Sequence, residues 1–291
     1  MTTPSPSRPQ PRTPAPSPPG AATPTNIEPA TGSAGVDVTQ LARRVRAVTP
    51  ARIFVGRIGT SYGTAQLLAL RADHAAARDA VTANLTLTSG PLAPLAERYG
   101  LFAVDSAADD RTQYLRRPDR GRRLSSIARD TITARCPHDT DLQVVIGDGL
   151  SAAAIEAQVP GLLPLLLDAA DQAGWSIGQT FAVNHCRVGI MNDVGEILHP
   201  KAVVLLIGER PGLATAQSMS AYLAWRPRAH HTDADRNLLS NIHPRGIAHP
   251  DAVSRIIALI RAMRATGASG ITLKEPDRRG PLDSDSVGTA P

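Results

Sequence analysis

The stretch VVLLIGERPGL, residues Val203–Leu213, places five aliphatic residues directly before a turn that combines glycine with charged residues. A continuous aliphatic run of this length is typical of a strand that is buried on both faces of a parallel sheet. Glu209 and Arg210 follow at the end of the run, and buried charges are costly unless a partner or a ligand satisfies them. The stretch therefore predicts an interior strand whose carboxyl end carries a binding site.

The segments around this strand alternate between strand and helix patterns. Three further strands are predicted, at Leu142–Ile146, Thr180–Asn184 and Met219–Trp225, the last of them more edge-like. Helical patterns lie between and after them: one begins behind Ser151, a residue type favoured as a helix N-cap, and the last runs from Asp251 to Gly267. Alternation of this kind predicts an α/β fold with a Rossmann-like parallel sheet over residues 138–274, which binds ligands at the carboxyl ends of its strands.

Residues 37–137 are dominated by helical periodicity. Helices are expected near Val38–Val48, Thr64–Val81, Pro91–Gly100 and Arg122–Cys136. We therefore expect a small helical domain in front of the sheet domain.

The two ends of the chain differ in composition from the rest. Residues 1–36 hold ten prolines within the first thirty positions, and residues 275–291 are similarly rich in small, polar and charged residues. Such segments bury too little apolar surface to offset their ordering entropy, so both are predicted to be disordered tails.

The bulk composition limits the class of protein. The 291 residues are 42% hydrophobic but only 3% aromatic, and the formal net charge is +5. The two cysteines, Cys136 and Cys186, fit a reducing compartment. A stretch of 18 apolar residues and an N-terminal signal pattern are both missing, so we expect a cytoplasmic protein without a membrane partner.

The turn IGDGLSA, residues 146–152, fits the G-x-G-x-x-A pattern in which a strand and a helix cradle phosphate. A dinucleotide-binding protein would also carry an acid after the second strand, where Asn184 and His185 stand instead. Two interpretations remain: a glycine turn that closes a helix against a strand, or a stand-alone nucleotide-binding module or oxidoreductase.

Three other clusters carry weaker signals. The arginine-rich stretch Arg116–Arg123 could contact phosphate, but scarce aromatic residues favour a solvated or subunit-facing turn over a nucleic-acid-binding protein. His230–Asp235 superficially suggests a metal site, yet adjacent histidines point apart, which favours a surface loop. NIHPRG, Asn241–Gly246, resembles the D-x-H-x-x-G signature of some cobalamin enzymes, with Asn in place of Asp. Neither a catalytic constellation nor a metal site is expected.

Longer motifs in register carry a family resemblance. They are YLRRPDRGRRL (114–124), LQVVIGDGLSAAAI (142–155), GEILHPKAVVLLIGERPGL (195–213) and DADRNLLSNIHPRG (233–246), with VGRIGT and TAQLLALRADHAAARD before them. Together they resemble the small subunit of ethanolamine ammonia-lyase over roughly residues 37–272.

The resemblance implies an adenosylcobalamin-dependent conversion of ethanolamine to acetaldehyde and ammonia. A large subunit would carry the catalytic residues, in a hetero-oligomer of six large and six small subunits, while the small subunit helps to enclose the cofactor. The cofactor would keep its own base on cobalt, so His243 would not be the lower ligand. The expected location is the cytoplasm, with a bacterial microcompartment as an alternative.

By motif, the cobalamin-contacting positions of the family fall on Val188, Glu209 and Leu238. The family typically has Cys where this chain has Leu238. A contact made by the backbone would survive that change, whereas one made by sulfur would not.

Overall fold

The computed structural model describes residues 38–48 and 57–274. The tails predicted for residues 1–36 and 275–291 lie outside the described residues. The helical pattern that was predicted to start behind Asp37 forms helix α1, Val38–Val48. After it come a two-stranded hairpin of β1 (Arg57–Ile58) and β2 (Ser61–Tyr62) and then helix α2, Thr64–Thr82.

The main sheet has six strands in the order β3-β5-β4-β6-β7-β8. The strands are β3 (Phe102–Asp105), β4 (Leu142–Gly147), β5 (Phe181–Asn184), β6 (Ala202–Gly208), β7 (Met219–Trp225) and β8 (Arg236–Ile242). The four strands predicted from sequence are all present, and β7 has the predicted bounds. All seven residues of β6 are buried, so the two-faced burial inferred from VVLLI is confirmed.

The predicted parallel sheet is confirmed in part: β3, β5, β4 and β6 are parallel, whereas β7 and β8 run antiparallel to their neighbours. Only residues 209–218 connect β6 to β7, and a parallel crossover needs a dozen or more residues. The expectation that Met219–Trp225 is edge-like is wrong: β8 lies outside it and forms the edge.

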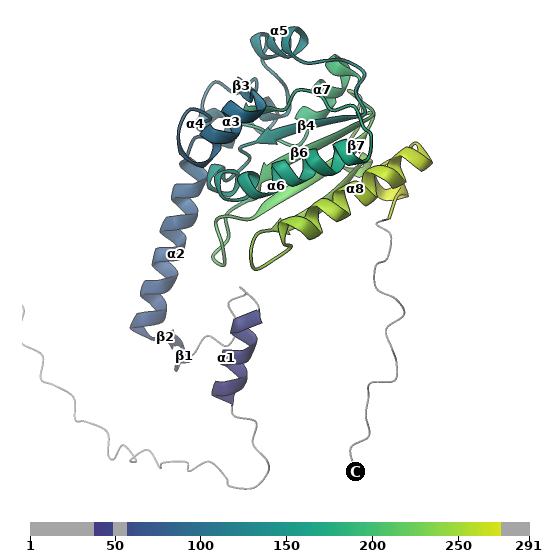
Figure 1. Cartoon of the computed structure of the whole chain (residues 1–291). Coiled ribbons are helices and arrows are strands. Elements are labelled where there is room, and N and C mark those ends of the chain that lie inside the picture. The colour runs from purple at the N-terminus through teal and green to yellow at the C-terminus, as the bar shows by residue number, and fades with distance from the viewer. Residues whose placement is uncertain (1–37, 49–56, 275–291) are drawn as a thin grey trace, which may run out of the picture. The chain divides into compact units, whose positions relative to one another are not determined.

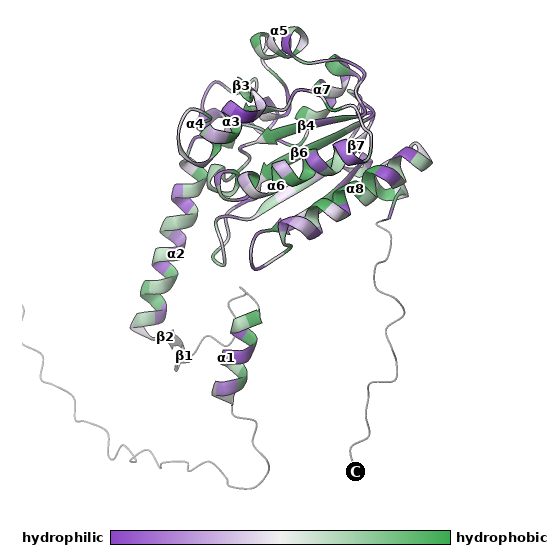
Figure 2. Ribbon diagram, in the orientation of Figure 1, coloured by the Kyte–Doolittle hydropathy of each residue, from purple (hydrophilic) through white to green (hydrophobic). Residues whose placement is uncertain are grey.

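Helices cover both faces of the sheet (Figure 1). Helices α6 (Ala152–Gln172) and α8 (His249–Thr266) share one core with one side of the strands, while α5 (Ser126–Arg135) and α7 (Ile190–Leu198) share the second core with the other side. Alternate residues of β4 divide accordingly, since Val144 belongs to the first core and Val145 to the second. Figure 2 shows the resulting hydrophobic strands between the helix layers.

Helix α6 is long and apolar enough to cross a membrane by length and composition alone. Several of its apolar side chains, including Ile155, Leu162 and Leu166, are fully buried in the first core, whereas Leu165 is exposed. Ser151 caps it as predicted, because the Ser151 Oγ accepts a hydrogen bond from the N–H of Ala154 at 3.1 Å. These contacts identify α6 as a core helix of the sheet domain.

The range 37–137 contributes to this sheet as well as containing helices. Its further helices are α3 (Ala93–Tyr99) and α4 (Arg111–Arg116), with short 3₁₀ turns η1 (Gly90–Leu92) and η2 (Arg120–Arg122). Strand β3 lies between α3 and α4 and pairs in parallel with β5, Phe102 opposite Phe181. The domain boundary at residue 137 stays a prediction.

Candidate functional site

A pocket of about 230 Å³ opens at the carboxyl ends of β4, β5 and β6, where the sequence predicted a ligand site. Each strand sends the residues that follow it into the lining: Gly149 and Leu150 after β4, Cys186–Val188 after β5, and Gly208–Arg210 at the end of β6. Ser220 and Tyr222 of β7 and Tyr114 of α4 complete it.

Glu209 is held in this pocket by two hydrogen bonds to one of its carboxylate oxygens. Glu209 Oε1 accepts from Ser220 Oγ at 2.7 Å and from the N–H of Asn241 at 2.8 Å. Within the part of the chain that the structure describes, Oε2 has no hydrogen-bond partner. The carboxylate is therefore tolerated at the strand end because donors from β7 and from the end of β8 satisfy Oε1. The second oxygen, Oε2, remains available to a ligand.

Val188 and Glu209 line the same pocket, whereas Leu238 does not. Leu238 lies on β8 directly opposite Tyr222, which does line the pocket, and its side chain is 49% exposed. Two of the three residues predicted from the family resemblance thus line one pocket, and Leu238 lies at its outer margin, beside the lining residue Tyr222.

Next to the pocket lining, between Gly147 and Gly149, lies a buried carboxylate that the sequence analysis did not single out. Asp148 accepts from the N–H of Cys186 at 2.8 Å, from the N–H of His185 at 2.9 Å and from Arg111 Nη1 at 3.0 Å. Burial raises the pKa of Asp148, while these donors favour its charged form. Because all three partners are N–H donors, we assign the ionised form, which ties the β5–α7 loop to α4.

Tyr114 stands above this carboxylate between two cations. The centres of the Arg111 and Arg187 guanidinium groups lie 4.7 and 4.3 Å from the centroid of its ring. Its hydroxyl donates to the carbonyl of Cys186 at 3.0 Å, and burial raises the pKa of the phenol well above its ordinary value. Burial likewise raises the pKa of the Cys186 thiol. The Tyr114 phenol and the Cys186 thiol are therefore protonated at neutral pH, and we assign them a role in positioning neighbouring groups rather than in proton transfer.

The turn GDGLSA after β4 packs closely against the turn that ends β6, and this close packing requires glycine in both turns. Gly149 has φ +56°, and a Cβ there would lie 2.2 Å from the carbonyl oxygen of Gly208. Conversely, a Cβ on Gly208 would lie 2.1 Å from the carbonyl oxygen of Ser151. The N–H of Leu150 donates to the same Gly208 carbonyl at 3.1 Å. This arrangement agrees with a structural glycine turn and gives the phosphate-cradle interpretation no support.

NIHPRG forms a turn in which both nitrogens of its histidine are engaged. His243 Nε2 lies 2.7 Å from Asn241 Oδ1, and His243 Nδ1 accepts from the N–H of Arg245 at 3.3 Å. Burial lowers the pKa of His243. In His230–Asp235, Thr232 and Asp235 form a capping box of the short turn η3, Asp233–Asp235. No group of three metal-ligating side chains occurs among residues 38–48 and 57–274.

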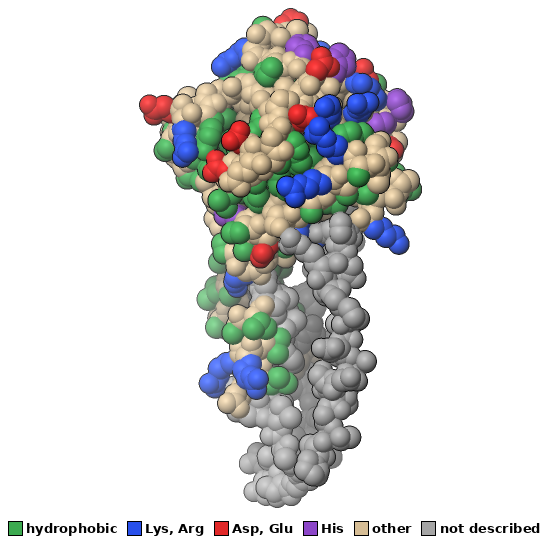
Figure 3. Space-filling view, turned by 45° about the vertical axis from the view of Figure 1, so that its right-hand side comes forward, with side chains coloured by type: hydrophobic (Ala, Val, Ile, Leu, Met, Phe, Trp, Pro, Cys, Tyr) green, Lys and Arg blue, Asp and Glu red, His purple; other side chains and the backbone are tan. Residues whose placement is uncertain are grey.

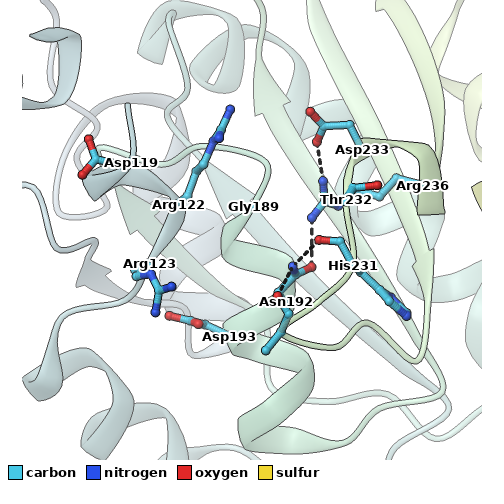
Figure 4. A pocket seen from close by; sticks show the side chains of 11 residues that line it. Asp119, Arg122, Arg123, Gly189, Asn192, Asp193, His231, Thr232, Asp233 and Arg236 are labelled. Atoms are coloured by element: carbon cyan, nitrogen blue, oxygen red, sulfur yellow. Dashed lines mark hydrogen bonds and ion pairs between the residues drawn. The ribbon is translucent and has the colours of Figure 1, made fainter. Parts of the chain in front are cut away.

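The arginine-rich stretch Arg116–Arg123 borders a second pocket, of about 420 Å³ (Figure 4). In this view, Arg122 and Arg123 lie on one side and the loop that carries Thr232 and Asp233 lies on the other. Arg117 is outside the pocket and pairs with Asp119 at 2.9 Å.

Several polar groups of this second pocket form hydrogen bonds with one another. Arg236 donates to Asp233 and, at 2.9 Å, to Asn192 Oδ1, and Asn192 Nδ2 donates to the carbonyl of His231 at 2.8 Å (Figure 4). Asp193 pairs with Arg129 at 2.8 Å. We interpret this network as a brace between α7 and β8.

The surface charges bear on the nucleic-acid alternative. On the face in Figure 3, Asp and Glu side chains lie among the Lys and Arg side chains. That face offers no continuous cationic surface of the kind that binds a phosphate backbone.

Sequence reasoning missed Ser220 and Tyr222, which come from the next strand, β7, and Tyr114, which comes from the distant helix α4. The alternating pattern of MSAYLAW would have placed Ser220 and Tyr222 on one face, since they are two residues apart in a strand. Asp148 lies between the two glycines of GDG, at a position to which the G-x-G-x-x-A pattern gives no role.

Several known proteins similar to this chain share one description. The family model "Ethanolamine ammonia-lyase light chain (EutC)" matches residues 39–274. The ethanolamine ammonia-lyase small subunit of Xanthomonas campestris pv. campestris is 41% identical over 252 residues, covering 85% of this chain and 92% of that protein. Those of Clostridium perfringens and Rhodopseudomonas palustris are each 40% identical, covering 79% and 80% of this chain and 76% and 89% of theirs.

Proposed function

The chain belongs to the ethanolamine ammonia-lyase light-chain family and is a component of an ammonia-lyase complex, and from this premise we propose that it helps to enclose adenosylcobalamin against a large catalytic subunit. The reaction is the conversion of ethanolamine to acetaldehyde and ammonia. The observation that carries the proposal is the convergence of Val188, Glu209 and the neighbour of Leu238 on one pocket at the carboxyl ends of the strands.

The residues present fit an edge of this cofactor. A corrin ring carries a fringe of neutral carboxamides over an apolar body, and the pocket offers the free Oε2 of Glu209 beside the apolar surfaces of Val188 and Tyr222. A volume of about 230 Å³ holds only a part of so large a molecule. The remaining surface must then come from a partner, as a small subunit requires.

The division of labour follows from the chemistry of the pocket. When bound, adenosylcobalamin supplies radical chemistry that no side chain can supply. Tyr114 and Cys186 are held protonated by burial, and Asp148 is enclosed by three N–H donors. This chain therefore orients the cofactor and excludes water, while the large subunit binds ethanolamine and carries the catalytic residues.

The assembly and location are proposed on the family alone. We propose a hetero-oligomer of six large and six small subunits, in the cytoplasm or within a bacterial microcompartment. Native mass spectrometry of the co-expressed subunits would count the copies directly.

Reconstitution tests the function. The purified full chain, the purified large subunit and their mixture would each be assayed for acetaldehyde release from ethanolamine at saturating adenosylcobalamin. We expect turnover only in the mixture. Turnover by this chain alone, or full turnover by the large subunit alone, would contradict the proposal. Titration of the chain with NAD tests the nucleotide-binding alternative, and we expect no binding.

A further inference from the structure

Arg187 is fixed in the pocket by packing rather than by an ion pair. It lies three residues after the end of β5, and its Cγ lies 2.8 Å from where a Cβ on Gly121 would stand, so only glycine leaves room for it. Its guanidinium lies over the Tyr114 ring, at 4.3 Å from the centroid. The stem and the plane of the side chain are therefore held in place before any ligand arrives.

The hydrogen-bonding capacity of this guanidinium is largely unused. Arg187 Nε is buried and has no partner, and Nη2 makes only a long contact of 3.5 Å with the carbonyl of Tyr114. A buried donor without an acceptor is destabilising, and more so when it is charged. The protein tolerates this cost at the wall of a pocket.

The local charges leave an excess of positive charge. Asp148 is the carboxylate beneath Tyr114, and Arg111 pairs with it at 3.0 Å. Among the described residues, neither Arg187 nor Arg210, the second cation of the lining, forms an ion pair. Glu209 uses Oε1 for Ser220 and Asn241. The two arginines and one glutamate of the lining therefore leave one positive charge in excess, which one bound anion would neutralise.

We infer that Arg187 binds a phosphodiester anion at this pocket and that, in the proposed complex, the anion is the phosphate of the nucleotide tail of adenosylcobalamin. This inference rests on the proposed function. The peripheral groups of the corrin are neutral amides, and the phosphodiester is the anionic group of the cofactor's periphery. Among the described residues Arg187 Nη1 has no partner and Nη2 has only the long contact with Tyr114, so these two terminal nitrogens can donate to a pair of phosphate oxygens.

Three cofactor forms separate the phosphate from the rest of the molecule. Dissociation constants would be measured by optical titration of the co-purified complex with adenosylcobalamin, adenosylcobinamide phosphate and adenosylcobinamide, the last of which lacks phosphate. For Arg187→Gln we expect about tenfold to hundredfold weaker binding of the first two ligands and an unchanged affinity for adenosylcobinamide. Arg187→Lys keeps the charge but loses the planar fork, so its loss should be smaller.

Arg264→Gln is the matched control. It removes one arginine charge from α8, and its partner Asp141 keeps its ion pair with Lys201 at 2.8 Å. All three affinities should stay at wild-type values in this variant.

The possible outcomes distinguish a failure of this inference from a failure of the proposed function. An equal loss for all three ligands, or no loss for any, would overturn the inference while leaving the proposed function intact. Failure of both Arg187 variants to assemble would show that Arg187 serves the fold alone and would also overturn it. If the wild-type complex binds none of the three cobalt compounds, the proposed function itself fails.

Discussion

Ser220 donates its hydroxyl hydrogen to Glu209 Oε1 over 2.7 Å and thereby joins β7 to the turn that ends β6. Asn241 donates its backbone N–H to the same oxygen at 2.8 Å, so one carboxylate oxygen connects three segments of the chain. The turn at Glu209 is therefore braced before any ligand binds. Oε1 serves the fold, and Oε2 remains for the cofactor that we propose.

These separate roles of Oε1 and Oε2 predict different effects for substitutions of Ser220 and of Glu209. Ser220→Ala should lower the free energy of unfolding by about 1.5–3 kcal/mol, because a buried hydrogen bond to a charged group is lost. The affinity of the assembled complex for adenosylcobalamin should change less than about threefold, since Oε2 is untouched. Chemical denaturation of the full chain and cofactor titration of the complex measure the two quantities.

Glu209→Ala should affect both quantities. It removes the acceptor of Ser220 and Asn241 and also the free oxygen, so we expect the stability loss together with about tenfold to hundredfold weaker cofactor binding. Turnover at saturating cofactor should be nearly kept. Equal affinity losses in Ser220→Ala and Glu209→Ala would show that Glu209 acts only through the turn.

The close packing of the turn after β4 against the turn after β6 predicts that an added methyl group at Gly149 will clash. Gly149→Ala should destabilise the chain by about 3 kcal/mol or more, because it combines a positive φ with a Cβ 2.2 Å from the Gly208 carbonyl. Gly174→Ala is the control: its φ is +70°, but nothing lies within 4 Å of the added Cβ, so about 1 kcal/mol is expected. Similar melting temperatures for the two variants would contradict this account.

The sequence predicted the elements whose signal is local. Met219–Trp225 was predicted with its observed bounds from its run of mostly apolar residues, although it was expected to be edge-like and is an interior strand. The direction of that strand was missed, although the short connection from β6 already excluded a parallel crossover.

Elements that depend on distant neighbours were not predicted. Helix α7 contains Gly195, which weakens a helical pattern, yet a Cβ there would lie 2.0 Å from the carbonyl of Pro227. Strand β3 has only four residues and is stabilised by its pairing with β5. In the site, Glu209 and Val188 could be reached by motif, whereas the stack of Arg187 on Tyr114 joins residues 73 positions apart that no local pattern connects.

Asp141 makes stability depend on pH at the other end of the sheet. Burial alone would raise its pKa, but donors from Lys201 and Ser176 outweigh this effect and lower it well below the ordinary value. The stabilisation is then complete above the unfolded-state pKa of about 3.9 and is lost as the pH falls towards the folded-state pKa. Asp141→Asn should therefore be less stable than wild type by a constant amount from about pH 5 to 8, and the gap should narrow below about pH 4.

Denaturation of both proteins across this range tests the sign. Arg264→Gln again serves as a control, because it leaves the Lys201 ion pair with Asp141 in place and should show a much smaller gap. A gap that widens as the pH falls would mean that Asp141 stabilises the fold in its protonated form.

Leu238 tests whether the outer margin of the site takes part in cofactor binding through its backbone or through its side chain. It lies on the edge strand opposite Tyr222, and its side chain is 49% exposed, so Leu238→Cys and Leu238→Ser should each change stability by only about 0.5 kcal/mol. If the backbone makes the contact, both variants should bind adenosylcobalamin within about twofold of wild type, because neither substitution removes a peptide group.

A contact made by the side chain at position 238 would give a different pattern of affinities in the same titration. If a thiol is the contacting group in this family, Leu238→Cys should bind the cofactor more tightly than wild type, while Leu238→Ser should not. If instead the leucine side chain itself covers an apolar edge of the cofactor, both variants should weaken binding, by up to about tenfold for the apolar area lost. Only equal affinities in wild type, Leu238→Cys and Leu238→Ser agree with a backbone contact, so either of the other two patterns would reject it.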